Sequence, residues 1–129
     1  MIILDTHIWI WWVSKSSRLT QNHQKYIQQY SSQGLGVSII SCWEVAKLVE
    51  KNRLDLSIDV SRWLEKAINY PNVRVLDLTI PIIVQSTQLE GFHNDPADQI
   101  IVATAKVYNY SLLTADNKIL NYSHVNTLN

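Results

Sequence analysis

The chain has 129 residues, 11 acidic and 11 basic side chains, and a formal net charge of zero. This length suits one domain with a real core and is too short for two well-buried ones, so we expect residues 1–129 to form a single domain. The composition, 47% hydrophobic and 17% charged, excludes a disordered chain, and the charge balance excludes a global basic field, so any nucleic-acid binding needs a local patch.

Short apolar runs alternate along the chain with longer amphipathic segments. The apolar runs predict strands at Ile2–Leu4, Gly36–Ile40, Val73–Leu76 and Ser111–Thr114, with His124–Val125 as a candidate fifth. The segments between them predict helices at Ile8–Val13, Gln21–Ser32, Cys42–Asn52, Val60–Asn69, Ile80–Leu89, Ala97–Tyr108 and Asn117–Tyr122. Such alternation is typical of an α/β sandwich around a mostly parallel sheet, here of about four to five strands.

Two helix starts carry capping signals. Ser41, followed three residues later by Glu44, fits a capping box. Asp95 before Pro96 supplies an N-cap and a proline at the first helical position, and Asp98 adds an acid in the first turn. We therefore expect helix starts at residues 41 and 95.

Three acids follow predicted strands on the same edge of the sheet. Ligands of open α/β sheets bind beyond the carboxyl ends of the parallel strands. Asp5 directly follows the first strand, Glu44 lies one helical turn beyond the second, and Asp116 follows the fourth. Asp98 joins them only if the loop from 90 to 95 brings its helix start to that edge.

Crowded carboxylates repel one another, and a divalent cation offsets this repulsion. The four acids offer hard oxygen ligands with no nearby cluster of Cys or His, which favours Mg²⁺ or Mn²⁺ over zinc. Such an ion activates water near neutral pH and stabilises charge on a phosphate. The acids therefore predict metal-assisted hydrolysis of a phosphodiester.

Four short segments resemble, in order, the acidic motifs of PIN domains: Leu4-Asp5-Thr6-His7, Ser41-Cys42-Trp43-Glu44, Asp95-Pro96-Ala97-Asp98 and Leu113-Thr114-Ala115-Asp116. The resemblance runs from the first strand to the last helix, and the order and spacing of the four motifs make it specific. Similarity to the VapC branch implies a PIN-like three-layer sandwich and a Mg²⁺- or Mn²⁺-dependent endoribonuclease. It also implies a toxin that is often dimeric and is held inactive by a VapB-type antitoxin.

By motif position, the resemblance also assigns roles to individual residues. The catalytic acids of the metal site would be Asp5, Glu44, Asp98 and Asp116. Thr6 and Thr114 would orient these acids from the side. Many relatives carry Arg directly after the third motif's acid, where this chain has Gln99, and the change removes a cation near the expected phosphate path.

Each acid also has a purely structural interpretation. Glu44 could only complete a capping box, and Asp98 could only complement a helix dipole. Asp116 could cap the short helix that follows it, and Asp5 could simply end a strand. We favour the metal site, because all four structural interpretations would have to hold together.

A basic helix face and several aromatic residues bear on RNA binding. Lys47 and Lys51 follow Glu44 at i+3 and i+7, which predicts a face that holds RNA phosphates; the alternative is a solvated face with one Glu–Lys pair. Ile8, Trp11 and Trp12 have helical spacing, which favours core packing or a protein interface over base stacking. Trp43 adjoins Glu44, but its ring should point roughly 100° away around the helix, so we assign it no role.

The remaining candidates receive structural interpretations. His7 and His93 lie in or near the motifs, and a supporting role is favoured over a general base, because a metal can activate water. Cys42 is interpreted as a small buried hydrophobe, since no His is placed to activate it. Its lack of a disulfide partner, together with an N-terminus that has no basic leader, predicts a cytoplasmic protein with no membrane segment.

Two other classes of α/β protein also place an Asp after the first strand, and a silent binding module of the same fold is a third alternative. A phosphatase with an aspartyl nucleophile would need a second Asp two residues after Asp5, where this chain has His7. A phosphoacceptor receiver would need an adjacent acidic pair near its first strand, which is absent. A catalytically silent PIN-fold binding module would be expected to have lost one or more of the four acids, and all four are present.

Overall fold

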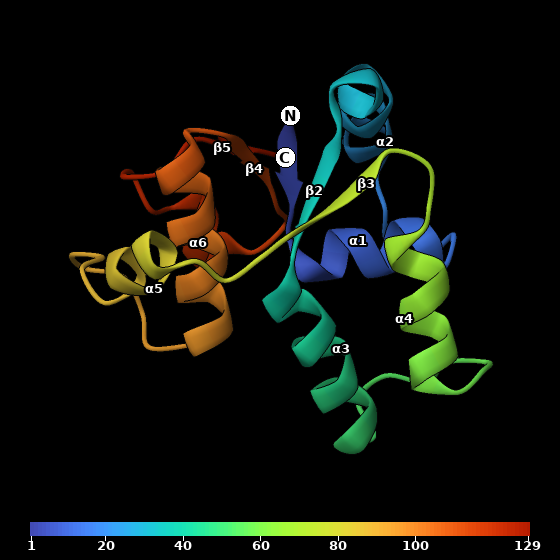
Figure 1. The fold of residues 1–129 in the computed structure, drawn as a ribbon. Coiled ribbons are helices and arrows are strands. Elements are labelled where there is room, and N and C mark those ends of the chain that lie inside the picture. Colours follow the sequence, from blue (N-terminus) through green and yellow to red (C-terminus); the bar gives the residue numbers. More distant parts are fainter.

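The computed structural model describes residues 1–129 and contains one five-stranded sheet between two layers of helices (Figure 1). The strand order is β3-β2-β1-β4-β5, and every neighbouring pair is parallel. The strands are β1 (Ile2–Leu4), β2 (Leu35–Ser38), β3 (Val73–Leu76), β4 (Ser111–Leu113) and β5 (Thr127–Leu128). The predicted α/β sandwich around a parallel sheet is confirmed.

Helices cover both faces of this sheet. They are α1 (Thr6–Val13), α2 (Gln21–Tyr30), α3 (Ile39–Glu50), α4 (Val60–Ile68), α5 (Ile80–Ser86), α6 (Pro96–Tyr108) and α7 (Asn117–Leu120), with a 3-10 turn, η1, at Ser31–Gln33. Figure 1 shows α5 and α6 on one side of the strands, with α1 and α4 on the other. No helix combines the length and the apolar character that crossing a membrane requires.

Two apolar clusters, one on each face, attach the helices to the sheet. In β1, Ile2 and Leu4 belong to the first cluster, together with Trp9, and Ile3 between them belongs to the second, together with Ile101. This alternation is the period of a strand. Burial on both faces explains why β1 is a continuous apolar run, and each such side chain contributes about 1.5 to 3 kcal/mol.

The tryptophans of α1 serve mainly the core, which is one of the two roles that the helical spacing predicted. Trp9 is fully buried, and its ring meets that of Trp63 edge-on at 5.4 Å between centroids. The ring of Trp12 meets that of Tyr70 in the same way at 5.0 Å. Trp11 and Trp12 are half-buried against the first cluster. Helix α1 is therefore packed mostly inward.

The second strand ends earlier than predicted, and α3 begins earlier. Ile39 and Ile40 are β-branched and were assigned to the strand, but both lie in the first turn of α3. Ser38 is the N-cap, and its hydroxyl accepts the N–H of Ile40 at 3.2 Å. The predicted capping box between Ser41 and Glu44 is therefore wrong, because the helix has already begun.

Other predicted boundaries differ by a few residues. Helices α2, α5 and α7 end before Ser32, Leu89 and Tyr122, their predicted ends. The fifth strand lies at Thr127–Leu128, in register with β4, and not at His124–Val125. These ends depend on which backbone groups find partners elsewhere in the fold, which local periodicity does not encode.

Replacing Ser38 by Ala should lower the free energy of unfolding by about 0.5 to 2 kcal/mol, because the Ile40 N–H loses its acceptor at the helix start. Ser38→Gly should cost only roughly a few tenths of a kcal/mol. Urea denaturation of the three proteins measures this difference. If the wild type and Ser38→Ala are equally stable, Ser38 is not the N-cap that stabilises α3.

Candidate metal centre

The strand order reverses at β1, which has β2 on one side and β4 on the other. Asp5 lies at the carboxyl end of β1 and is 5% exposed. Its carboxylate accepts the N–H of Thr6 at 2.9 Å and the hydroxyl of Thr114 at 2.7 Å. Burial raises the pKa of Asp5, and these two hydrogen bonds oppose that rise. The first acid is thus fixed in the crevice where such sheets bind ligands.

Thr114 connects Asp5 to Asp116. The hydroxyl that donates to Asp5 also accepts the N–H of Asp116 at 3.0 Å. Asp116 is the N-cap of α7, and its carboxylate accepts the N–H of Lys118 at 2.8 Å. The cap interpretation of Asp116 is therefore confirmed, and capping leaves the residue beside Asp5 at the same edge of the sheet.

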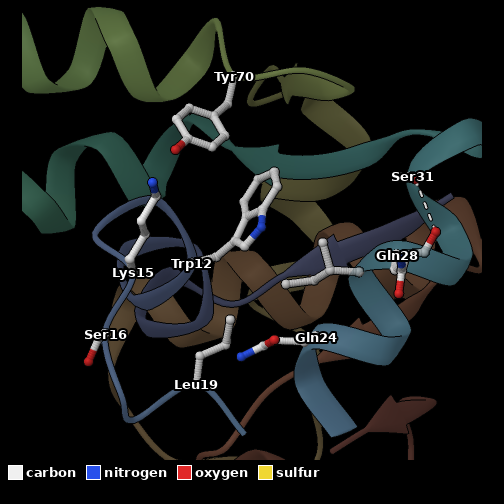
Figure 2. Close-up of a pocket in the computed structure, with 9 residues that line it drawn as sticks. Trp12, Lys15, Ser16, Leu19, Gln24, Gln28, Ser31 and Tyr70 are labelled. Carbon is white, nitrogen blue, oxygen red and sulfur yellow. Dashed lines mark hydrogen bonds between the residues drawn. The ribbon is translucent and has the colours of Figure 1, made fainter. Parts of the chain in front are cut away.

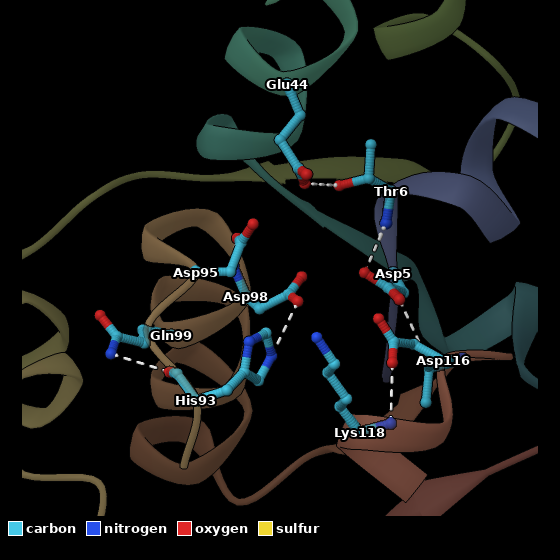
Figure 3. Close-up of polar contacts among 10 residues, drawn as sticks. Asp5, Thr6, Glu44, His93, Asp95, Asp98, Gln99, Asp116 and Lys118 are labelled. Atoms are coloured by element: carbon cyan, nitrogen blue, oxygen red, sulfur yellow. Dashed lines mark hydrogen bonds and ion pairs between the residues drawn. The ribbon is translucent and has the colours of Figure 1, made fainter. Parts of the chain in front are cut away.

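Glu44 reaches this edge from α3. The Thr6 hydroxyl donates to its carboxylate (Figure 3) and also lies 2.8 Å from the buried hydroxyl of Ser41. Because the Thr6 proton is directed to Glu44, the Ser41 hydroxyl donates to Thr6. Both residues of the predicted capping box thus contact α1 and do not cap α3.

The start of α6 brings Asp95 and Asp98 to Glu44, a close group of three acids that does not include Asp5 or Asp116. Carboxylate oxygens of Glu44, Asp95 and Asp98 lie within 4.8 Å of one another. His93 is in the loop that precedes the helix, and its Nε2 lies 3.0 Å from Asp98 Oδ2. This loop therefore does bring the helix start to the edge, which was the condition for including Asp98 with the other acids (Figure 3).

Two charged residues at the cluster were missed in the sequence. Asp95 was interpreted only as the N-cap of α6, which it is, since it accepts the N–H of Asp98 at 2.9 Å; its carboxylate also joins those of Glu44 and Asp98. Figure 3 shows the side chain of Lys118 directed into the space between Asp98 and Asp116. No sequence pattern marks Lys118, whereas the spacing of Asp95 from Asp98 was a usable signal.

Neighbouring residues support the cluster without adding ligands. Gln99, which stands where many relatives carry Arg, donates its side-chain amide to the His93 carbonyl at 3.0 Å and so holds the loop. His93 supports Asp98, in line with the predicted supporting role. His7 packs its ring near that of Trp11, 6.0 Å away. Cys42 is half-buried against the core, and burial raises the pKa of its thiol.

Burial and mutual repulsion shift the acids strongly. Burial, with a smaller contribution from nearby carboxylates, raises the pKa of Glu44 to about 7 against the hydrogen bond from Thr6. Burial also raises the pKa of Asp98 to about 8, and Asp5 is the largest of the neighbouring charges that add to this. A buried set of carboxylate oxygens that resists ionisation fits a hard divalent cation such as Mg²⁺ or Mn²⁺.

The largest pocket lies elsewhere and lacks this chemistry. It measures about 590 Å³ and lies among α1, α2 and Tyr70, which precedes β3 (Figure 2). Trp12, Leu19 and Ile27 form its apolar wall, and no carboxylate lines it. The candidate centre is thus identified by its charges and not by the size of a cavity.

Comparisons with known proteins agree on one family. Residues 2–125 match the family model described as the PIN domain. The chain is 32% identical over 124 residues to Ribonuclease VapC22 of Mycobacterium tuberculosis, covering 95% of this chain and 92% of that protein.

Solved structures share the fold. The structure of VapBC2 from Rickettsia felis bound to a DNA fragment from its promoter aligns with a TM-score of 0.74 at 16% identity, covering 100% of this chain and 98% of that one. A toxin-antitoxin complex from Klebsiella pneumoniae aligns with a TM-score of 0.68 at 16% identity, covering 100% and 97%.

We expect the metal-free protein to lose stability as the pH rises from about 4.5 to about 8. The pKa of Glu44 is raised from its ordinary 4.5 to about 7 and that of Asp98 from its ordinary 3.8 to about 8, so over this range the folded state binds more protons than the unfolded state. The thermal midpoint in EDTA should fall across the range. Asp98→Asn should show a shallower fall, and excess Mn²⁺ should restore stability at the upper end. A thermal midpoint in EDTA that rises with pH, or one that falls as steeply in Asp98→Asn as in the wild type, would contradict the raised pKa values.

Proposed function

The chain belongs to the PIN domain family, and from this membership we propose that it is a metal-dependent endoribonuclease, the toxin of a VapBC-type toxin–antitoxin pair. The similarity to a VapC ribonuclease over nearly the whole length of both proteins supports the reaction class. The observation that carries the proposal is the convergence of acids from β1, α3, α6 and the end of β4 on one edge of the sheet.

The proposed metal ligands are Asp5, Glu44, Asp98 and Asp116, and the ion is Mg²⁺ or Mn²⁺. A bound ion supplies activation of water and stabilises charge on the phosphate and the leaving oxygen. Asp95, with its carboxylate within 4.8 Å of those of Glu44 and Asp98, adds negative charge to the site.

The chain's own residues prepare this site. Thr114 fixes the orientation of Asp5, and Thr6 fixes that of Glu44, through the hydrogen bonds described above. His93 lies beside Asp98, with its Nε2 3.0 Å from the carboxylate. Acids held in place before the substrate arrives need little reorganisation during the reaction, which is a main source of catalytic power.

Lys47 and Lys51 are the proposed contacts to RNA phosphates. Both lie on α3 or at its end, beyond Glu44, and line one groove with it. Lys47 forms an ion pair with Glu50 at 2.9 Å, so its charge is already partly neutralised, whereas Lys51 forms no ion pair.

A cytoplasmic location, expected from the sequence, stays a prediction.

A VapB-type antitoxin and a second copy of the chain are the proposed protein partners. The exposed aliphatic side chains gather on α5, where Ile80 is 76% exposed, Ile83 45% and Val84 47%. Helix α1, expected from its tryptophans to offer the apolar surface, is packed mostly inward. We therefore assign the dimer contact to α5, since adjacent exposed aliphatics mark protein interfaces.

Cleavage of single-stranded RNA should require added Mg²⁺ or Mn²⁺ and stop in EDTA. Glu44→Gln and Asp98→Asn should lower the rate by orders of magnitude, because a neutral amide coordinates a divalent ion poorly. The metal-induced gain in thermal midpoint should shrink in both variants. Asp59→Asn is the matched control, since Asp59 is exposed and makes no capping hydrogen bond. Cleavage at the wild-type rate by Glu44→Gln, or by protein shown to be metal-free, would refute the four-acid site.

The chain should be a dimer by light scattering at micromolar concentrations, and Ile83→Asp should convert it to a monomer, because a buried carboxylate without a partner is costly. Lys25→Asp, which also adds an acid to an exposed helical position, should leave the dimer intact. If the wild type is monomeric at every concentration, the dimer proposal is wrong. If the Ile83→Asp variant is still a dimer, the dimer contact does not lie on α5.

A further inference from the structure

A groove of about 280 Å³ leads away from the metal centre along α3 and the start of α6. Trp43, Lys47, Lys51 and Arg53 line it on one side, and Asp95 and Pro96 on the other. Glu44 also lines it, so the groove shares two acids with the metal centre. A molecule held at the centre would therefore extend into the groove.

The charges in this groove are separated along its length. The two acids belong to the metal centre, while the three cations lie on α3 and just beyond its end. Lys51 and Arg53 are exposed and form no ion pair, so their charges face solvent uncompensated. This arrangement suits a polyanion with one phosphate at the metal and its neighbours along the cations.

Trp43 places a large aromatic surface in the same groove. Its side chain is 49% exposed, and Lys47 Nζ lies 5.9 Å from the ring centroid. Its angular offset from Glu44 around the helix, which argued against a role, does not remove it from the groove, because the groove runs across the surface of α3. An exposed aromatic ring beside cations is the pairing that proteins use to bind unpaired nucleic-acid bases.

We propose that this groove is a single-stranded RNA subsite, in which one base stacks on Trp43 while adjacent phosphates pair with Lys51 and Arg53. The proposal rests on the ribonuclease function and names the form of its substrate. A base inside a duplex has both faces covered by its neighbours, so stacking on Trp43 requires an unpaired base. Trp43 is then a positioning residue that sets which linkage reaches the acids.

Charge favours RNA over a protein in this groove. A protein interface would be expected to bury a patch with few charges at its centre, whereas here Trp43 has Lys47 over its ring and further cations beyond it. The largest group of exposed aliphatic residues in this chain is on α5, whereas α3 exposes one aliphatic residue near Trp43, Ile39.

The first test compares Trp43→Leu with Trp43→Phe, using a short fluorescein-labelled oligouridylate as the probe. Trp43→Leu should weaken binding in EDTA by about 5- to 150-fold, the range that base–aromatic stacking implies. It should raise KM for cleavage in Mn²⁺ by a similar factor, with kcat largely unchanged. Trp43→Phe keeps an aromatic face and should restore most of the affinity. Thermal midpoints of both variants check that they fold.

The second test locates the stacked base. Oligouridylates with one abasic position at a time should show a single position where loss of the base weakens binding to the wild type but not to Trp43→Leu. This coupling between side chain and base is not expected from a merely structural role. Lys51→Gln combined with Arg53→Gln should lower the salt slope of binding by about 1.4, at about 0.7 per phosphate contact.

Each outcome separates the subsite from the catalytic proposal. If the wild type cleaves RNA in Mn²⁺ and Trp43→Leu matches its KM and affinity, the subsite is wrong and the ribonuclease stands. If Trp43→Leu leaves RNA binding intact but dissociates the dimer, the groove is a protein surface. If the wild type neither binds nor cleaves RNA, the ribonuclease proposal fails and the subsite fails with it.

Discussion

Parallel pairing of β1 with both β2 and β4 is the constraint on which the acidic site depends. The pairing places β1 in the middle of the sheet, where both of its faces are buried, and it directs the strand's carboxyl end into the crevice where the strand order reverses. Asp5 follows directly and has no freedom to turn away, because the Thr6 N–H and the Thr114 hydroxyl hold its carboxylate. The other acids are arranged around this fixed point.

The buried carboxylates that the proposed activity needs also lower the stability of the metal-free fold. Burial, reinforced by repulsion between neighbouring carboxylates, raises the pKa of Asp98 to about 8 and that of Glu44 to about 7. Two apolar clusters on opposite faces of the sheet supply the folding free energy that offsets this repulsion. A divalent cation would relieve it, and metal binding would then raise the folding stability of this protein.

The groove beside the acids adds a proposed substrate-binding surface to the proposed metal site. Negative charge is concentrated where a metal would sit, and positive charge lies farther along α3, so one helix and its C-cap contribute Glu44 and Lys51. Trp43 directly precedes Glu44 in the sequence, and its exposed ring gives the groove an apolar face. Reaction and substrate binding thus depend on how α3 packs beside α6.

Local signals in the sequence determined the α/β alternation, the doubly buried β1 and the start of α6 at Asp95, because periodicity and capping act over a few neighbouring residues. They also placed Asp5 and Asp116 at strand ends. The tertiary structure alone decided that Ser41 contacts Thr6 and not the start of its own helix. It also decided that Asp95 meets Glu44 and that Trp43 faces a groove shared with Lys51. These outcomes depend on the packing of α3 against α1 and α6, and contacts between residues far apart in the chain leave no mark on local spacing.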